Sequence, residues 1–232
     1  MKNPKLLVAC TMFTLLATAL TAKAAEVTVK GSVLPGSCTA TVSGGGIDYG
    51  PINSKELSPT DYTLLKELTT GFSISCDSPT KVALRAVNGR PGTAPISGGN
   101  GGGQGDGLAP MYIFGRNAVG VAGLGLDNQR KIGGYGIRIT AGKTKADAKD
   151  VDSLRAHDTN LSWTKDAHSG DLYDPFFTRV NSWAATGSLI PIPFTTLAGE
   201  LSVQAYLNKR SELDLSKPIT LNGLTTIEMV YL

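Results

Sequence analysis

Histidine, tryptophan and cysteine are scarce in this sequence, which has two, two and three of them among 232 residues. His157 precedes Asp158, and His168 lies three residues before Asp171. Neither histidine has the i, i+4 spacing of a helical metal site, and no G-x-S-x-G motif of a hydrolase is present. We interpret these residues as polar loop residues, and we expect no enzymatic activity, catalytic residue, metal or cofactor.

Long apolar runs are absent beyond the first two dozen residues. Lys2 and Lys5 precede the uncharged segment 6–20, and Ala22-Lys23-Ala24 has the small residues of a cleavage site. This order is typical of a secretory signal peptide at residues 1–24, and the apolar run is too short for a comfortable membrane span. We therefore expect a soluble exported protein whose mature chain begins at Ala25.

The mature chain also lacks a net charge. Removing Lys2, Lys5 and Lys23 lowers the 22 basic residues to 19, which equals the number of acidic residues. A neutral chain offers no electrostatic attraction to nucleic acid or to an anionic membrane. We therefore expect no nucleic-acid partner. The length that remains fits one large β-domain.

Cys38 and Cys76 are the cysteines that remain after processing. An even number of cysteines in an exported chain favours a disulfide, which would remove on the order of 3–4 kcal/mol of unfolded-state freedom. Zinc is the poorer alternative, because no histidine lies near either cysteine.

The first segment of the mature chain, 25–36, carries a strand pattern without a local partner. Val27, Val29, Gly31 and Val33 recur at every second residue, so an extended chain places them on one face. No hairpin partner precedes the segment, and Pro35-Gly36 interrupts the chain after it. Its backbone must therefore be paired far away in the sequence or on another molecule.

The remaining sequence is dominated by short alternating segments, with little helix. The last segment places Ile227, Met229 and Tyr231 on one face, so the C-terminus is expected within a sheet. Together these patterns predict an antiparallel β-sandwich of immunoglobulin-like type. We expect strands at 47–50, 111–114, 136–140, 190–194, 201–207 and 225–232, a hairpin of 70–76 with 81–87, a connection with one helical turn at 53–68, a mobile loop with nine glycines at 88–107 and a short helix at 144–155.

Aromatic residues gather in the 144–190 insertion. Trp163, Tyr173 and Trp183 could stack on a sugar ring if they were exposed together. They could instead cover one end of the sandwich, which is the more common use of such residues. The sequence leaves both interpretations open.

Several segments resemble pilin subunits of chaperone–usher fimbriae. The pattern 27–33 before Cys38 resembles the N-terminal extension of those subunits, 71–77 resembles their second cysteine strand, and Tyr231 resembles an aromatic residue near their C-terminus. The residue patterns at 48–50 and 58–62 are most similar to those of a beta-clade group of fimbrial subunits long catalogued as a domain of unknown function. Many such pilins have a glycine fourteen residues from the end, where this chain has Ile219, with Gly223 nearer the terminus.

The resemblance implies a fold and a mode of assembly. It implies an incomplete immunoglobulin-like sandwich, the pilin fold, at 37–232 with long loop insertions, preceded by a donor strand at 25–36. A periplasmic chaperone would first lend the missing strand, and Ile227, Met229 and Tyr231 would lie in the strand that it contacts. At the outer-membrane usher, Val27, Val29, Gly31 and Val33 of another subunit would replace it.

These implications lead to two hypotheses for the function. The first is a structural subunit of a surface fimbria, exported through the periplasm and polymerised head-to-tail for surface attachment as a homo- or hetero-polymer. The alternative is a free-standing periplasmic or surface carbohydrate-binding sandwich that uses Trp163, Tyr173 and Trp183. It predicts a monomer whose 26–33 strand folds into its own sheet.

Overall fold

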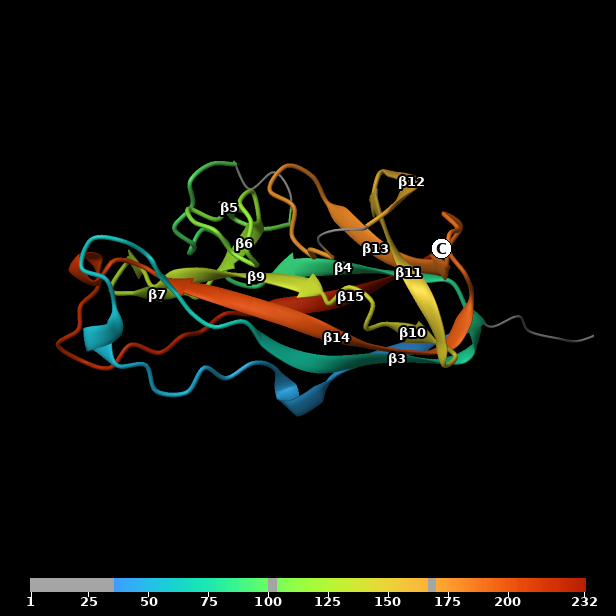
Figure 1. Ribbon diagram of the computed structural model, residues 1–232, viewed down its shortest axis with the longest axis horizontal. Coiled ribbons are helices and arrows are strands. Elements are labelled where there is room, and N and C mark those ends of the chain that lie inside the picture. The colour runs from blue at the N-terminus through green and yellow to red at the C-terminus, as the bar shows by residue number, and fades with distance from the viewer. Residues whose placement is uncertain (1–35, 100–103, 167–169) are drawn as a thin grey trace, which may run out of the picture. The chain divides into compact units, whose positions relative to one another are not determined.

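The computed structural model describes residues 36–99, 104–166 and 170–232 (Figure 1). All of them belong to one compact unit, Pro35–Leu232. The predicted signal peptide, the four apolar-face residues of the 25–36 segment and His168 lie outside the described residues. The predictions made for them therefore stay predictions.

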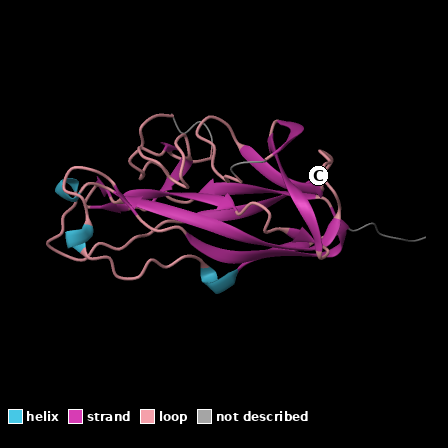
Figure 2. Cartoon of the chain, in the orientation of Figure 1, coloured by secondary structure: helices cyan, strands magenta, loops and turns pink. Residues whose placement is uncertain are grey.

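Strands form nearly all of the regular structure (Figure 2). The strands are β1 (Cys38–Val42), β2 (Thr63–Leu64), β3 (Leu68–Thr80), β4 (Val82–Asn88), β5 (Gly107–Leu108), β6 (Gly120–Gly123), β7 (Leu126–Asp127), β8 (Arg130–Lys131), β9 (Gly133–Ile139), β10 (Lys145–Ala146), β11 (Lys149–His157), β12 (Asn160–Lys165), β13 (Arg179–Ala185), β14 (Phe194–Leu207) and β15 (Thr225–Tyr231). Three single-turn 3₁₀ helices are η1 (Ser43–Gly45), η2 (Ser54–Glu56) and η3 (Arg210–Glu212).

The strands form two antiparallel layers. In the first layer the order is β1-β3-β14-β9-β6-β5, with β2 and β10 also beside the long strand β14. In the second layer the order is β15-β4-β13-β11-β12. The layers are continuous at one side, because β10 pairs with both β14 and β11 (Figure 1).

The core lies between the two layers. Phe72 of β3 and Phe194 of β14 contact Trp183 of β13, with ring centroids 6.3 and 5.9 Å apart. Trp183 has no exposed surface, and Ile74 and Leu84 are almost fully buried. Apolar side chains at alternate positions thus meet from both sheets, and the predicted antiparallel β-sandwich is confirmed.

The predicted disulfide is also confirmed. Cys38 on β1 and Cys76 on β3 are directly opposite in the ladder, with their Cα atoms 4.0 Å apart, and both are buried. Among the described residues, β1 pairs with β3 alone. The disulfide therefore holds an edge strand onto the sandwich.

The predicted hairpin of 70–76 with 81–87 is wrong. Both segments are strands, but β3 pairs with β1 and β14, whereas β4 pairs with β15 and β13. The chain crosses from one layer to the other at Lys81, between the two strands. An alternating pattern shows which side chains face the core, and it is the same for a hairpin and for two strands in facing sheets.

The predicted helix at 144–155 is wrong as well. This segment forms β10 and β11, joined by a turn in which Asp147 and Ala148 have positive φ angles of 45° and 65°. The Asp147 carboxylate accepts hydrogen bonds from the backbone of Thr196 at 2.8 Å and of Thr195 at 3.1 Å. Pairing with neighbouring strands thus overrides the local helix preference of the alanines.

Two predicted strands, 47–50 and 111–114, are loops. Of a third, 190–194, only Phe194 belongs to a strand, β14, and Pro191 forms an isolated bridge to Ala184. In 47–50 the side chains of Ile47 and Tyr49 pack on the core, but the backbone forms no ladder with the described residues. In 111–114 the only pairing is an isolated bridge from Ile113 to Arg116. The helical turn expected in 53–68 is present as η2.

In the glycine-rich segment 88–107, the described residues 88–99 and 104–107 are held by hydrogen bonds, contrary to the prediction of a mobile loop. The buried carboxylate of Asp106 accepts hydrogen bonds from Asn88 Nδ2, Gly92 N and Ala94 N at 2.7–2.8 Å. One acidic residue thus ties both ends of the segment together by polar contacts, where apolar burial is scarce.

Candidate functional site

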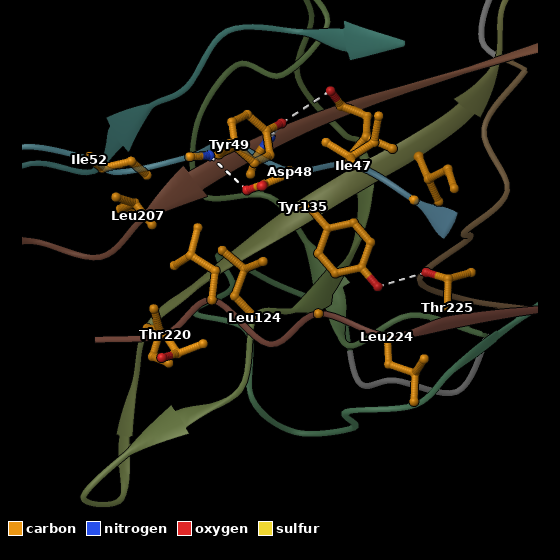
Figure 3. Close-up of a pocket in the computed structure, with 18 of the residues that line it drawn as sticks. Ile47, Asp48, Tyr49, Ile52, Leu124, Tyr135, Leu207, Thr220, Leu224 and Thr225 are labelled. Carbon is orange, nitrogen blue, oxygen red and sulfur yellow. Dashed lines mark hydrogen bonds between the residues drawn. The ribbon is translucent and has the colours of Figure 1, made fainter. Parts of the chain in front are cut away.

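A groove of about 1210 Å³ opens between the two layers, along the edge strands β1 and β15. One wall consists of β1 and the segment 45–57 that follows it. The opposite wall consists of residues 213–224 and the beginning of β15. Figure 3 shows side chains from both walls, among them Tyr49 and Leu224, around the cavity.

The floor of the groove is apolar. Strands β9 and β14 contribute most of it, and each of these side chains is at most 8% exposed. The floor residues are Phe72, Leu84, Leu124, Ile132, Tyr135, Ile137, Leu201, Val203, Ala205 and Leu207. A cavity with an apolar floor suits the side chains of another apolar segment better than it suits water.

Tyr49 fixes the first wall to the central strand. Its hydroxyl donates to Val203 O at 3.2 Å and accepts from Ala205 N at 3.0 Å. Burial raises the pKa of Tyr49 to about 12, because the charged phenolate would lose its hydration. Residues 46–52 form no backbone-to-backbone hydrogen bond with the described chain, so the wall depends on side chains such as Tyr49.

The second wall is fixed where it enters β15. Asn222 N donates to Leu124 O at 2.9 Å, and Arg90 Nε donates to Asn222 O at 3.1 Å. Among the described residues, 215–221 form no backbone-to-backbone hydrogen bond. Gly50 N and Ser216 N donate to the side chains of Asp48 and Asp214. The other peptide groups of 46–52 and 215–221 have no hydrogen bond to the described residues and are left to water or to an added chain.

Three hydroxyl groups meet at the start of β15. Thr225 Oγ1 lies 2.6 Å from the hydroxyl of Tyr135 (Figure 3). The hydroxyl of Tyr173 lies 2.7 Å from the same atom. Burial raises the pKa of both tyrosines. These bonds attach the start of β15 to β9 and to the 170–178 connection, and they fix the position of this edge strand.

The hydrogen-bond pattern identifies the backbone groups that face the groove on β15. In an antiparallel pair, alternate residues bond to the partner strand and the others face away from it. Leu224 O accepts from Gly89 N, and Leu232 N donates to Lys81 O. Even-numbered residues of β15 therefore bond to β4, and the groups at Thr225, Ile227, Met229 and Tyr231 face the open edge.

The same reasoning applies to β1. Asp77 N donates to Ser37 O, so Thr39 and Thr41 bond to β3. The backbone groups of Cys38, Ala40 and Val42 therefore face the open edge.

The two edges run in opposite directions. The first residue of β1, Cys38, lies beside the last residue of β15, Tyr231, whose hydroxyl accepts from Cys38 N at 3.0 Å. An additional strand between them would be parallel to one edge and antiparallel to the other.

The structure brings some of the predicted residues to the groove. Ile227 lines it, and Ile227 and Met229 are partly buried against the core, as the alternation of the last strand predicts. Ile219, at the position of the expected glycine, packs from the second wall onto the core. A Cβ atom at Gly223 would lie 2.7 Å from the Tyr135 ring, so glycine allows the wall to pass close over that ring.

Sequence reasoning missed Tyr49, Tyr135 and Thr225. Their segments carry no motif for a groove, and their roles depend on contacts across 90 or more positions of the chain. The tyrosine in the expected strand 47–50 was the nearest signal, because a partly apolar residue with a hydroxyl often anchors a loop to a sheet.

The suggested sugar-stacking set does not form an exposed platform. Trp183 has no exposed surface and Tyr173 is 1% exposed, so neither ring is available to a ligand at the surface. Trp163 on β12 packs partly buried against Ala83, Ala156 and Val180 on the outer face of the second layer. The interpretation in which aromatic residues cover protein surface fits these positions.

The remaining candidates do not gather into a site. His157 ends β11 and stacks on Phe177, with ring centroids 3.5 Å apart. Within residues 36–99, 104–166 and 170–232, no three metal-ligating side chains come together. No helix in this same part of the chain is long and apolar enough to cross a membrane.

Comparison with known proteins finds a family model that matches part of the chain and relatives that are 27% identical to it. A family model described as "Protein of unknown function (DUF1120)" matches residues 27–136, which include the 27–33 pattern, β1, the first wall and part of the floor. Protein GltF of Escherichia coli (strain K12) is 27% identical over 229 residues, which cover 89% of this chain and 88% of that protein. Uncharacterized protein YhcF of the same organism is 27% identical over 246 residues, which cover both chains completely. No solved structure matches the chain.

Proposed function

We propose that this protein is a structural subunit of a chaperone–usher fimbria, in which the 26–33 segment of one copy fills the groove of the next. The observation that carries the proposal is the apolar groove between the edges β1 and β15. Such edges pair readily with added strands, and strand addition of this kind is known from chaperone–pilin complexes.

The 26–33 segment has the length and pattern that the groove requires. Its seven residues 27–33 span about 23 Å when extended, and β15 also has seven residues. Four residues of β15 direct their backbone towards the open edge, and the apolar face of the segment has four positions, Val27, Val29, Gly31 and Val33. Each valine that enters the groove would contribute roughly 1.5–3 kcal/mol.

The same groove suggests the partners. An uncovered apolar groove promotes aggregation, so a periplasmic chaperone that lends a strand would protect the newly exported subunit. Exchange of that strand for the 26–33 segment at an outer-membrane usher would then build a head-to-tail polymer at the cell surface. This role needs no catalytic residue and no cofactor.

A pair of matched variants tests the donor role. Val29→Arg places a charge on the apolar face of the donor, whereas Thr28→Arg places the same charge on the opposite face. We expect Val29→Arg to abolish oligomers of the mature chain in size-exclusion chromatography, because a buried unpaired charge is costly, and Thr28→Arg to retain them. Equal oligomer formation by the two variants, or a wild-type chain that stays monomeric with or without chaperone, would contradict the proposal.

A further inference from the structure

One backbone group on the open edge of the groove already has a partner. Cys38 N faces the edge, where a completed sheet would provide a backbone carbonyl as its acceptor. In this structure the hydroxyl of Tyr231 accepts that hydrogen bond at 3.0 Å. The bond joins the two edges just beyond the end of the groove, whose lining begins at Ala40 on β1 and ends at Ile227 on β15.

The two partners of this bond differ in exposure and in attachment. Cys38 is 7% exposed and is fixed by the disulfide to β3. Tyr231 is 51% exposed and ends the edge strand β15, one residue before the end of the chain. If an entering strand requires the Cys38 N–H, the tyrosine side chain is the partner that can move into solvent.

We propose that Tyr231 is a latch that closes this end of the empty groove and is displaced when a strand enters. Its hydroxyl takes the place of a carbonyl of the incoming strand and keeps Cys38 N–H satisfied until exchange. The inference rests on the proposed function, because it describes how the same groove is regulated. It predicts that the hydroxyl competes with the last backbone bond of the entering strand.

The test uses Tyr231→Phe in the full mature chain, with Tyr112→Phe as the matched control. Tyr112 is 62% exposed and belongs to neither edge strand. Its variant also loses one tyrosine hydroxyl but leaves the bond between the edges unchanged. The probe is a fluorescent synthetic peptide of residues 25–34. We expect Tyr231→Phe to capture the peptide roughly three- to tenfold faster than the wild type, because one hydrogen bond no longer has to be broken. Tyr112→Phe should match the wild type.

Amide hydrogen exchange at Cys38 in the peptide-free protein provides a second measurement. We expect faster exchange in Tyr231→Phe, because the amide loses its acceptor. Equal or slower peptide capture by Tyr231→Phe would overturn the latch and leave the proposed function intact. If no variant captures the peptide, the proposed function fails. If the Cys38 amide exchanges at the same rate in Tyr231→Phe and in the wild type, the proposal that Tyr231 closes the edge is refuted by that result alone.

Discussion

Tyr49 connects the loop after β1 to the central strand β14 through one hydroxyl that both donates and accepts a hydrogen bond. Burial is the main cause of its raised pKa, which is about 12 against 10.0 for an unperturbed tyrosine. The folded protein therefore holds this proton more tightly than the unfolded chain does. Its contribution to stability is complete below pH 10 and is lost as the pH rises towards 12.

The loss of stability with rising pH leads to a prediction for Tyr49→Phe. At pH 9 the variant should lose about 1–3 kcal/mol of unfolding free energy, because two hydrogen bonds disappear. Between pH 9 and pH 11 its stability should fall less than that of the wild type, because one buried phenol no longer titrates. Urea unfolding at both pH values measures the difference, with Tyr112→Phe as the exposed control. An identical pH dependence in the wild type and Tyr49→Phe would show that the Tyr49 proton is not linked to folding.

At the scale of elements, β1 depends on the disulfide more than any other strand does. It has five residues and, in the described part of the chain, one neighbouring strand. The Cys38–Cys76 bond closes a loop with a sequence separation of 38. A loop of this size restricts the unfolded chain strongly.

We predict that the double variant Cys38→Ala, Cys76→Ala unfolds at lower urea concentration than the wild type, with a loss of about 2–5 kcal/mol. Reduction of the wild type with dithiothreitol should produce a similar loss, and the double variant should not respond to the reductant. A variant as stable as the oxidised wild type would mean that the ladder to β3 alone holds the edge strand.

Local patterns explain which elements could be predicted from sequence. The disulfide and the faces of β15 follow from residue type and from a period of two, both of which are local properties. The partners of a strand are not local, so β3 and β4 were expected in one hairpin although they lie in facing layers. The order in 88–107 depends on three hydrogen bonds to Asp106, which apolar patterning does not reveal.

The groove was expected only through the family resemblance. Its walls at 45–57 and 213–224 contain little regular structure, and a long-range hydrogen bond from Tyr49 positions one of them. Alternation cannot predict such a wall, because its side chains reach the core without forming a ladder.

At the scale of the whole molecule, the proposed assembly joins the groove of one copy to the 26–33 segment of the next, so the proposed growth is head-to-tail. A chain without residues 25–33 would keep its groove and lose its donor. We predict that adding this chain to the wild type during assembly shortens the oligomers in proportion to its share, because each added copy accepts a strand and offers none. Size-exclusion chromatography measures the distribution of oligomer lengths. As the control, the Thr28→Arg variant is added in the same amounts and should leave this distribution unchanged. Oligomers of unchanged length would exclude head-to-tail growth.

The position of Cys38 has a mechanical consequence for such a fibre. Tension along the polymer would enter each subunit through the segment before β1 and would reach Cys38 two residues after Gly36. There the sulfur bridge passes the pulling force directly to β3, which has thirteen residues and is bonded along most of its length to β14. Force would thus bypass the five-residue edge strand, so stretching would be resisted by the centre of the sheet while β1 is not peeled away.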